Sequence, residues 1–153
     1  MAPAARYHWL RLRASCHPTE RPEAVREALR FVSGLGEAAF QAALADTPLE
    51  THHGLPLHIL EVTLDRSRAV RDVLDRVRAL PGAPALVAAS AQARTDDDGV
   101  FYLRFDKQEA AQGRLVLRDG EDAVQLRLKL ETYPASRDAA VAGIEGLAAA
   151  GRA

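Results

Sequence analysis

Residues 96–130 alternate between apolar and polar side chains with a period of two, which is the pattern of half-buried β-strands. The alternation predicts three strands, Val100–Phe105, Arg114–Arg118 and Ala123–Glu131. Side chains on a strand point alternately to the two faces of the sheet, so one parity can form a core and the other an outer face. The apolar parity consists of Phe101, Leu103, Phe105, Leu115, Leu117, Val124, Leu126, Leu128 and Leu130. The opposite parity is rich in cations, and it is the main functional clue in this sequence.

A strand near the N-terminus, Arg6–Cys16, repeats the same pattern of aromatic and arginine side chains on its polar side. If all these strands share one sheet, its uncovered face gathers Tyr7, Trp9, Arg11, Arg13, Tyr102, Arg104, Arg114, Arg118, Gln125, Arg127 and Lys129. Aromatic rings interleaved with cations are typical of surfaces that bind single-stranded nucleic acid. The planar guanidinium of arginine suits both phosphate binding and stacking on bases. A merely solvated or partner-covered face is the competing interpretation, because antiparallel sheets often leave one polar face open.

The remaining segments predict helices and one hairpin. Apolar residues at helical spacing, such as Val25, Leu29 and Val32, indicate an inward-facing stripe on the first helix. The expected helices are a segment from about Arg21 to Ser33, a short turn at Glu37–Leu44, a helix from a cap at Asp65-Arg66-Ser67 to about Leu80, Ala83–Ala93, a short helix at Asp106–Gln112 and Ala135–Ala149. Leu49–Thr51 and Leu57–Leu64 are expected to pair as a hairpin, and Asp119–Asp122 to form the turn between the last two strands. This order predicts an α+β fold, a mostly antiparallel sheet with helices on one face, in a single domain over residues 1–153.

The chain has 153 residues and a formal net charge of −1, so it is not basic overall as many nucleic-acid-binding domains are. A basic surface therefore requires segregation of charge, and helix residues such as Glu23, Glu27 and Asp72 are expected to carry the balancing acid. The single cysteine, Cys16, excludes an internal disulfide and favours a reduced, cytoplasmic setting. No signal peptide or membrane-spanning segment is indicated by the sequence.

No motif for catalysis or for a cofactor is evident in the sequence. There is no phosphate-binding loop, nucleophile elbow, metalloprotease motif or cysteine cluster. His52 and His53 are adjacent and would point to opposite faces of a strand, which disfavours metal binding by the pair. The acidic run Asp96–Asp98 would suit a metal-dependent phosphodiesterase, but three acids before a glycine are more simply a solvated turn. The prediction is that the chain is not an enzyme and holds no cofactor or metal.

Residues 98–117 (DGVFYLRFDKQEAAQGRLVL) and 124–135 (VQLRLKLETYPA) resemble an archaeal RNA-binding family that has been predicted to be an exosome subunit. The segment 52–61 and the first strand and helix fit the same resemblance, which covers about residues 7–146. It implies an α+β fold similar to that of a large-ribosomal-subunit protein that binds 5S ribosomal RNA, and a role in RNA metabolism. The family's most recognisable run matches Asp106, Lys107, Gln108 and Gly113. In structural terms, Asp106 is expected to cap the short helix, Gly113 to adopt a positive φ, and Lys107 and Gln108 to be exposed.

The resulting hypothesis is a non-catalytic RNA-binding protein of RNA processing, turnover or ribosome assembly, which binds through the open face of its sheet. Its expected RNA-binding residues are Tyr7, Trp9, Arg11, Arg13, Tyr102, Arg104, Lys107, Arg114, Arg127 and Lys129. The expected partners are single-stranded or structured RNA and an RNA-processing or ribosomal protein. The alternative is a protein-interaction module or homodimer that uses the same face.

Overall fold

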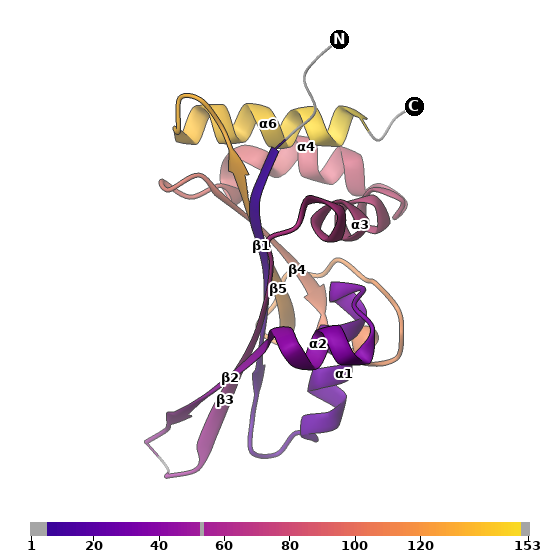
Figure 1. The fold of residues 1–153 in the computed structure, drawn as a ribbon, viewed down its shortest axis with the longest axis vertical. Helices are drawn as coiled ribbons and strands as arrows, with labels where there is room; N and C mark the ends of the chain where they lie inside the picture. Colours follow the sequence, from indigo (N-terminus) through magenta and orange to yellow (C-terminus); the bar gives the residue numbers. More distant parts are fainter. Residues whose placement is uncertain (1–5, 53, 151–153) are drawn as a thin grey trace. The chain divides into compact units, whose positions relative to one another are not determined.

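The computed structural model describes residues 6–52 and 54–150 (Figure 1). Within these residues the chain forms five strands and six helices: β1 (Arg6–Cys16), α1 (Pro22–Ser33), α2 (Glu37–Ala43), β2 (Leu44–Glu50), β3 (Pro56–Leu64), α3 (Ser67–Arg78), α4 (Ala83–Arg94), β4 (Val100–Asp106), α5 (Lys107–Ala111), β5 (Ala123–Glu131) and α6 (Arg137–Ala150). The strands form an antiparallel sheet in the order β2-β3-β1-β5-β4. The α+β class predicted from the sequence is confirmed.

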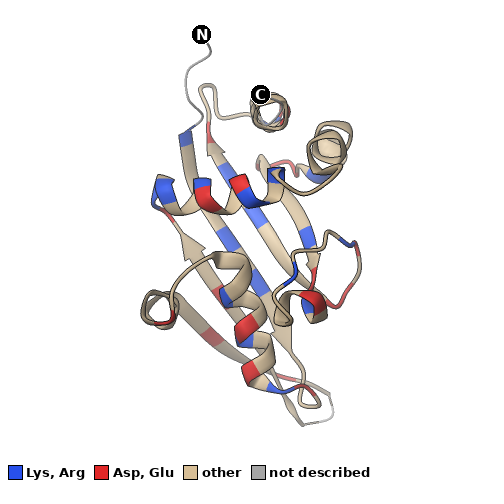
Figure 2. Cartoon of the chain, turned by 90° about the vertical axis from the view of Figure 1, so that its right-hand side faces the viewer, with Lys and Arg blue, Asp and Glu red and all other residues tan. Residues whose placement is uncertain are grey.

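The predicted parities of β1, β4 and β5 are also confirmed. Leu10, Leu12, Ala14 and Cys16 of β1 are buried, whereas the residues between them are half-buried. The same alternation holds along β4 and β5, because the helices cover only the apolar side of the strands. Figure 2 looks onto the sheet from the side of the helices. The opposite side of β1, β4 and β5 is therefore the side that remains open.

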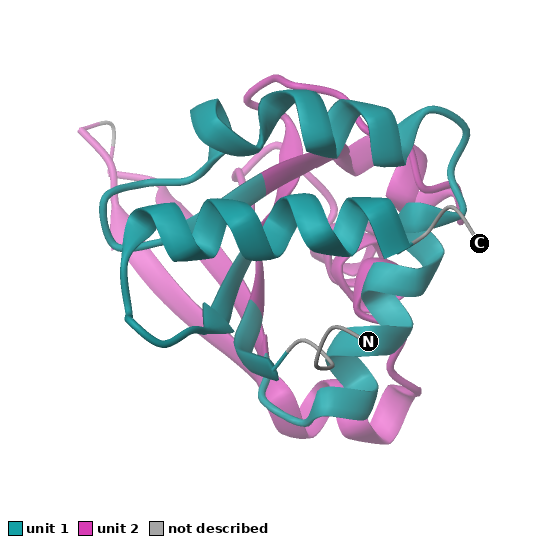
Figure 3. Cartoon of the chain, turned by 90° about the horizontal axis from the view of Figure 1, so that it is seen from above, with its two compact units in different colours: residues 1–10, 64–102, 127–153 teal, residues 11–63, 103–126 magenta. Residues whose placement is uncertain are grey.

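The chain divides into two compact units (Figure 3). Unit 1 contains residues 1–10, 64–102 and 127–153, and unit 2 contains residues 11–63 and 103–126. β1, β4 and β5 each contribute one part of their length to unit 1 and the other part to unit 2. Within unit 1, α4 packs against α6 and α3; within unit 2, α1 packs against α5 and α2.

The prediction of a strand at Arg114–Arg118 is wrong. Residues 113–122 form a loop that has strand-like pairing with β4 at one isolated bridge, between Phe105 and Leu117, and β5 is the direct neighbour of β4 in the sheet. Gly113 has a φ of 81°, and the Arg114 N–H donates to the carbonyl of Glu109, so the chain leaves α5 in a turn. Leu115 and Leu117 are consequently half-buried instead of forming core. The predicted hairpin turn at Asp119–Asp122 is wrong for the same reason.

Local predictions at the element ends had mixed outcomes. Asp106 caps α5, since its carboxylate accepts a hydrogen bond from the Glu109 N–H at 2.8 Å. The expected cap of α3 is wrong, because no side chain makes the capping hydrogen bond at Arg66. The first strand of the hairpin is longer than predicted and begins at Leu44, directly after α2, where it pairs with Val62 of β3.

Candidate nucleic-acid interface

On the open side of unit 1, Tyr102 is the centre of a cluster with fixed geometry. Its hydroxyl donates to Oδ2 of Asp96 at 2.9 Å, and the guanidinium carbon of Arg127 lies 5.5 Å from the centre of its ring. That distance is typical of a cation–π contact. Tyr102 and Arg127 are both half-buried, so the pair presents a planar guanidinium and an aromatic ring held together.

Asp96 anchors this cluster from the turn before β4. Its Oδ1 accepts hydrogen bonds from the backbone N–H groups of Asp98 and Val100, each at 2.9 Å. Burial raises the pKa of Asp96, but these two bonds and the one from Tyr102 outweigh it and hold the pKa below its ordinary value. Burial, followed by the bond to Asp96, raises the pKa of Tyr102. The phenol therefore stays protonated and keeps its position at neutral pH.

The other candidates of unit 1 are Tyr7, Trp9 and Lys129, and all three side chains are half-buried on the open parity of β1 and β5. The ammonium group of Lys129 donates to the backbone carbonyl of Asp98. Within residues 6–52 and 54–150 no carboxylate is bonded directly to Lys129, although its charge contributes to the lowered pKa of Asp96.

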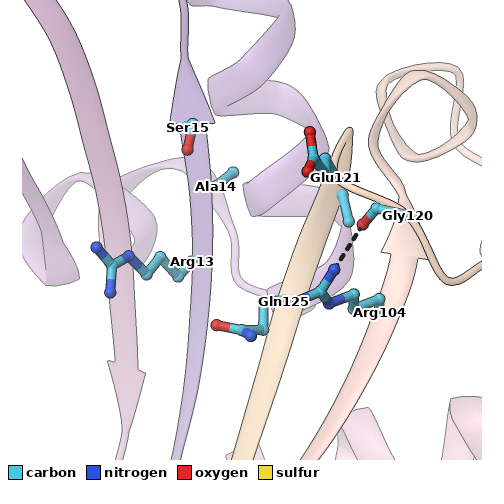
Figure 4. A pocket seen from close by; sticks show the side chains of 8 residues that line it. Arg13, Ala14, Ser15, Arg104, Gly120, Glu121 and Gln125 are labelled. Carbon is cyan, nitrogen blue, oxygen red and sulfur yellow. Dashed lines mark hydrogen bonds between the residues drawn. The ribbon is translucent and has the colours of Figure 1, made fainter. Parts of the chain in front are cut away.

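In unit 2 the open side holds a pocket of about 280 Å³ (Figure 4). It is lined by Arg13, Ala14, Ser15, Arg104, Gly120, Glu121, Ala123 and Gln125. The Nη1 atom of Arg104 donates to the carbonyl of Gly120 at 2.9 Å and so fixes the loop to β4. In Figure 4, Glu121 and Ser15 lie above, and Arg13, Gln125 and Arg104 lie below. The lining of the pocket thus includes one carboxylate, Glu121, and two arginines that lie on opposite sides of Gln125, with Arg104 nearer the loop that carries Glu121.

Lys107 does not lie on this surface. Its side chain is 3% exposed, and its Nζ atom lies 2.8 Å from the carbonyl oxygen of Ser15, 2.8 Å from Oε1 of Glu20 and 3.0 Å from Oδ1 of Asp122. The expectation that Lys107 is exposed is therefore wrong, because two carboxylates and a carbonyl satisfy its charge inside unit 2. Gln108 is exposed as expected, and its amide donates to Oδ2 of Asp122.

The loop arginines are also paired with carboxylates. Arg114 Nε lies 2.5 Å from Oε2 of Glu109, and Arg118 forms an ion pair with Asp106. Both arginines are exposed, and neither lies on a strand. By contrast, among the described residues the side chains of Arg13 and Glu121 have no hydrogen-bonding or ion-pair partner, and the only such partner of Arg104 is the Gly120 carbonyl. Arg11, Gln125 and Arg127 have partners of their own.

Three features of the surface were not expected from the sequence. Glu121 was assigned to a hairpin turn, so nothing in the pattern placed it beside Arg13 and Arg104. Tyr133 is 82% exposed and was not among the residues expected on the surface. The charge segregation is incomplete, since α3 carries Arg68, Arg71, Arg76 and Arg78 beside its two aspartates (Figure 2). The exposure of Tyr133 has a sequence signal, because a tyrosine before a proline commonly lies at a turn.

Comparison with known proteins places the chain in a family. A family model described as RNA binding matches residues 9–130. PAB1135 of Pyrococcus abyssi, named an RNA-binding protein, is 30% identical over 148 residues, which cover 94% of this chain and 95% of the relative. The chain belongs to this RNA-binding family. The matched segment contains the pocket of unit 2 and every proposed RNA-binding residue except Tyr7.

Solved structures agree with this assignment. Mth689 of Methanothermobacter thermautotrophicus, described as a DUF54 protein, is 31% identical, with a TM-score of 0.74 over 92% of this chain and 97% of that one. AF2318 of Archaeglobus fulgidus, also assigned to DUF54, is 28% identical, with a TM-score of 0.80 over 93% of this chain and 99% of that one. The archaeal RNA-binding family expected from the resemblance is therefore confirmed, while the exosome role and the likeness to a 5S-RNA-binding ribosomal protein stay predictions.

Residues 6–52 and 54–150 lack two further features. No helix in that part of the chain is long and apolar enough to cross a membrane. In the same residues, no three side chains of histidine, cysteine, aspartate or glutamate are grouped so that they would hold a metal ion.

Proposed function

We propose that this chain binds RNA, without catalysing a reaction, through the outward-facing side chains of β1, β4 and β5. The observation that carries the proposal is that the match to the RNA-binding family spans residues 9–130, a range that holds Arg13 and Arg104, neither of which is bound to a carboxylate of the described residues. A guanidinium without a carboxylate partner keeps its full attraction for phosphate, which dominates RNA affinity. RNA processing, turnover or ribosome assembly in an archaeal cell is the setting that we propose.

The roles differ among the candidate residues. Tyr7, Trp9 and Tyr102 stack on unpaired bases, and Arg11, Arg13, Arg104, Arg127 and Lys129 contact phosphates. Because Arg127 lies against the ring of Tyr102, the two side chains act as one stacking surface. Neighbouring carboxylates neutralise the charges of Lys107 and Arg114, which weakens the attraction of both residues for phosphate. They therefore hold neighbouring segments in place instead of contacting RNA.

The experiment that tests this proposal compares two double variants that lose the same charge. Arg104→Ala combined with Arg127→Ala removes cations from the open side, whereas Arg68→Ala combined with Arg71→Ala removes exposed cations from α3. Binding of short single-stranded RNA is measured by fluorescence anisotropy over a range of salt concentrations. Each lost phosphate contact should reduce the slope of log affinity against log salt by about 0.7.

The proposal expects a weaker affinity and a flatter salt dependence for the Arg104 and Arg127 variant alone. An equal loss in both double variants would mean that RNA binds through general charge and not through the open side. Absence of RNA binding by the unmodified protein, together with a concentration-dependent mass in light scattering, would favour a protein-interaction module or homodimer.

A further inference from the structure

We propose that the pocket of unit 2 holds one unstacked nucleotide and prefers guanine as its base. In this arrangement Arg104 contacts the phosphate of that nucleotide, Arg13 contacts a neighbouring phosphate, and the carboxylate of Glu121 accepts hydrogen bonds from the Watson–Crick edge of the base. This inference rests on the proposed RNA-binding function and adds to it a site and a base preference.

The size of the pocket limits what it can hold. Its volume of about 280 Å³ lies at the lower end of the range of roughly 300–1,000 Å³ that small-molecule sites occupy. Such a volume suits one nucleotide and is too small for several stacked ones. Sequence-specific recognition of RNA commonly uses single bases that are turned out of a stack and hydrogen-bonded on their edges. The pocket therefore matches a base in that conformation.

The pocket is lined by charged groups of both signs. In the described part of the chain, the Arg13 guanidinium and the Glu121 carboxylate each lack a hydrogen-bonding or ion-pair partner, although nearby cations such as Arg114 and Arg118 are paired. The two arginines can bind phosphates of the RNA backbone on either side of Gln125. The Glu121 carboxylate would repel a phosphate, so it is suited to a neutral group that offers N–H donors.

Guanine offers the best match to a carboxylate among the RNA bases. Its N1–H and N2 amine lie side by side and can donate to both carboxylate oxygens at once. Adenine and cytosine each offer one exocyclic amine on this edge, beside a ring nitrogen that accepts. Uracil offers one N–H between two carbonyl oxygens, which a carboxylate repels. The expected order of preference therefore places guanine first and uracil last.

The loop that carries Glu121 is fixed on both sides before any ligand binds. Asp122, the next residue, is bonded to the buried Lys107, which also donates to the carbonyl of Ser15 on the other side of the pocket. Gly120, the preceding residue, accepts the hydrogen bond from Arg104. A pocket whose edges are already held loses less conformational entropy on binding, which favours recognition of a single base.

The test uses labelled oligouridine of about eight nucleotides, a length that a small single-strand site can span, and the same oligonucleotide with one central guanine. Affinities are measured by fluorescence anisotropy for the full chain and for Glu121→Gln, Arg13→Gln and Glu145→Gln. Glu145 is an exposed acid of α6 and serves as the charge-matched control. A further oligonucleotide carries inosine in place of guanosine and so lacks only the N2 amine.

We expect the guanine-containing RNA to bind about ten-fold more tightly than oligouridine, with inosine between the two. Glu121→Gln should bring the ratio close to one without weakening the binding of oligouridine. Arg13→Gln should weaken both RNAs and keep the ratio, and Glu145→Gln should change neither affinity.

A ratio near one in the unmodified protein, or a ratio that survives in Glu121→Gln, would overturn the guanine pocket. If salt-sensitive binding then still depends on Arg104 and Arg127, the proposed RNA-binding function stands and only the pocket inference fails. If no RNA binds at all, the proposed function fails and the pocket inference fails with it.

Discussion

The Nζ atom of Lys107 lies 2.8 Å from Oε1 of Glu20, although 87 residues separate the two in the sequence. The contact joins the first residue of α5 to the segment between β1 and α1, both within unit 2. Asp122 binds the same ammonium group at 3.0 Å, so one buried cation connects three separate segments of the unit. The bond between Lys107 and Asp122 helps to hold the loop beside the pocket in position.

Replacing Lys107 with Met should destabilise the protein strongly. The substitution keeps the length of the side chain but leaves Glu20, which is largely buried, without its counter-charge. Removing one partner of a buried ion pair typically costs roughly 3–5 kcal/mol, and because Asp122 is more exposed we expect a loss of about 3 kcal/mol. Urea denaturation measures it, with Gln108→Met as the exposed neighbouring control. Equal stability of both variants would show that the ion pair contributes little.

Loss of the Asp96 carboxylate should affect stability in a pH-dependent way. A carboxyl whose pKa is lower in the folded state stabilises the fold above its unfolded pKa of about 4, and that contribution disappears as the pH falls through the folded pKa. The gap in unfolding free energy between the unmodified protein and Asp96→Asn should therefore be constant near neutral pH and shrink below about pH 4. Denaturation at several pH values measures this gap, with Asp97→Asn as the control for loss of a charge in this turn. A gap that stays constant down to low pH would contradict the prediction.

Two glycines with left-handed backbone should tolerate alanine differently. Gly99 and Gly113 have φ values of 79° and 81°, so either substitution should cost about 1 kcal/mol from backbone strain. A Cβ at Gly99 would also lie 3.2 Å from Cβ of Ala140, whereas one at Gly113 would meet nothing within 4 Å. Gly99→Ala should therefore have the lower thermal unfolding midpoint of the two variants. The reverse order would mean that the turn before β4 adjusts more easily than the end of α5.

Arg13 and Arg114 should contribute unequally to RNA binding, although both are arginines of unit 2. Arg13→Ala removes a cation with no partner among the described residues, whereas Arg114→Ala removes one that is paired with Glu109. The slope of log affinity against log salt should decrease by about 0.7 for Arg13→Ala and remain nearly unchanged for Arg114→Ala. Anisotropy titrations at several salt concentrations distinguish the two. Equal changes would show that pairing with a carboxylate does not decide which arginine contacts phosphate.

The sequence pattern predicted the parts of the fold in which local periodicity and burial agree. The strict alternation of β1, β4 and β5 identified the buried parity correctly, and the cap of α5 at Asp106 follows from local chemistry. The segment 114–118 alternates equally well, but it pairs with the edge strand β4 at one isolated bridge, Phe105 with Leu117, and so forms no strand. Periodicity within a segment carries no information about which neighbour is available.

The sequence pattern is equally uninformative about which distant residues meet in the candidate site. Lys107 beside the exposed Gln108 was interpreted as a surface residue, because its partners Glu20 and Asp122 come from distant segments. Glu121 belongs to the pocket because contacts between distant segments, among them Arg104 with Gly120 and Lys107 with Asp122, hold its loop against β4 and α5. The sequence pattern predicts the outward-facing cations of the strands, but it does not predict which carboxylates neutralise some of these cations.

Because β1, β4 and β5 are each divided between the two units, the two units have all their segments translated at different times during synthesis. All the segments of unit 2 have been translated once residue 126 is added, although residues 1–10, which belong to unit 1, are translated first. Unit 1 must wait for the second part of β5 and for α6, against which α4 packs. On the ribosome, therefore, the unit that holds the pocket has its full set of segments while α4 is still without its partner helix.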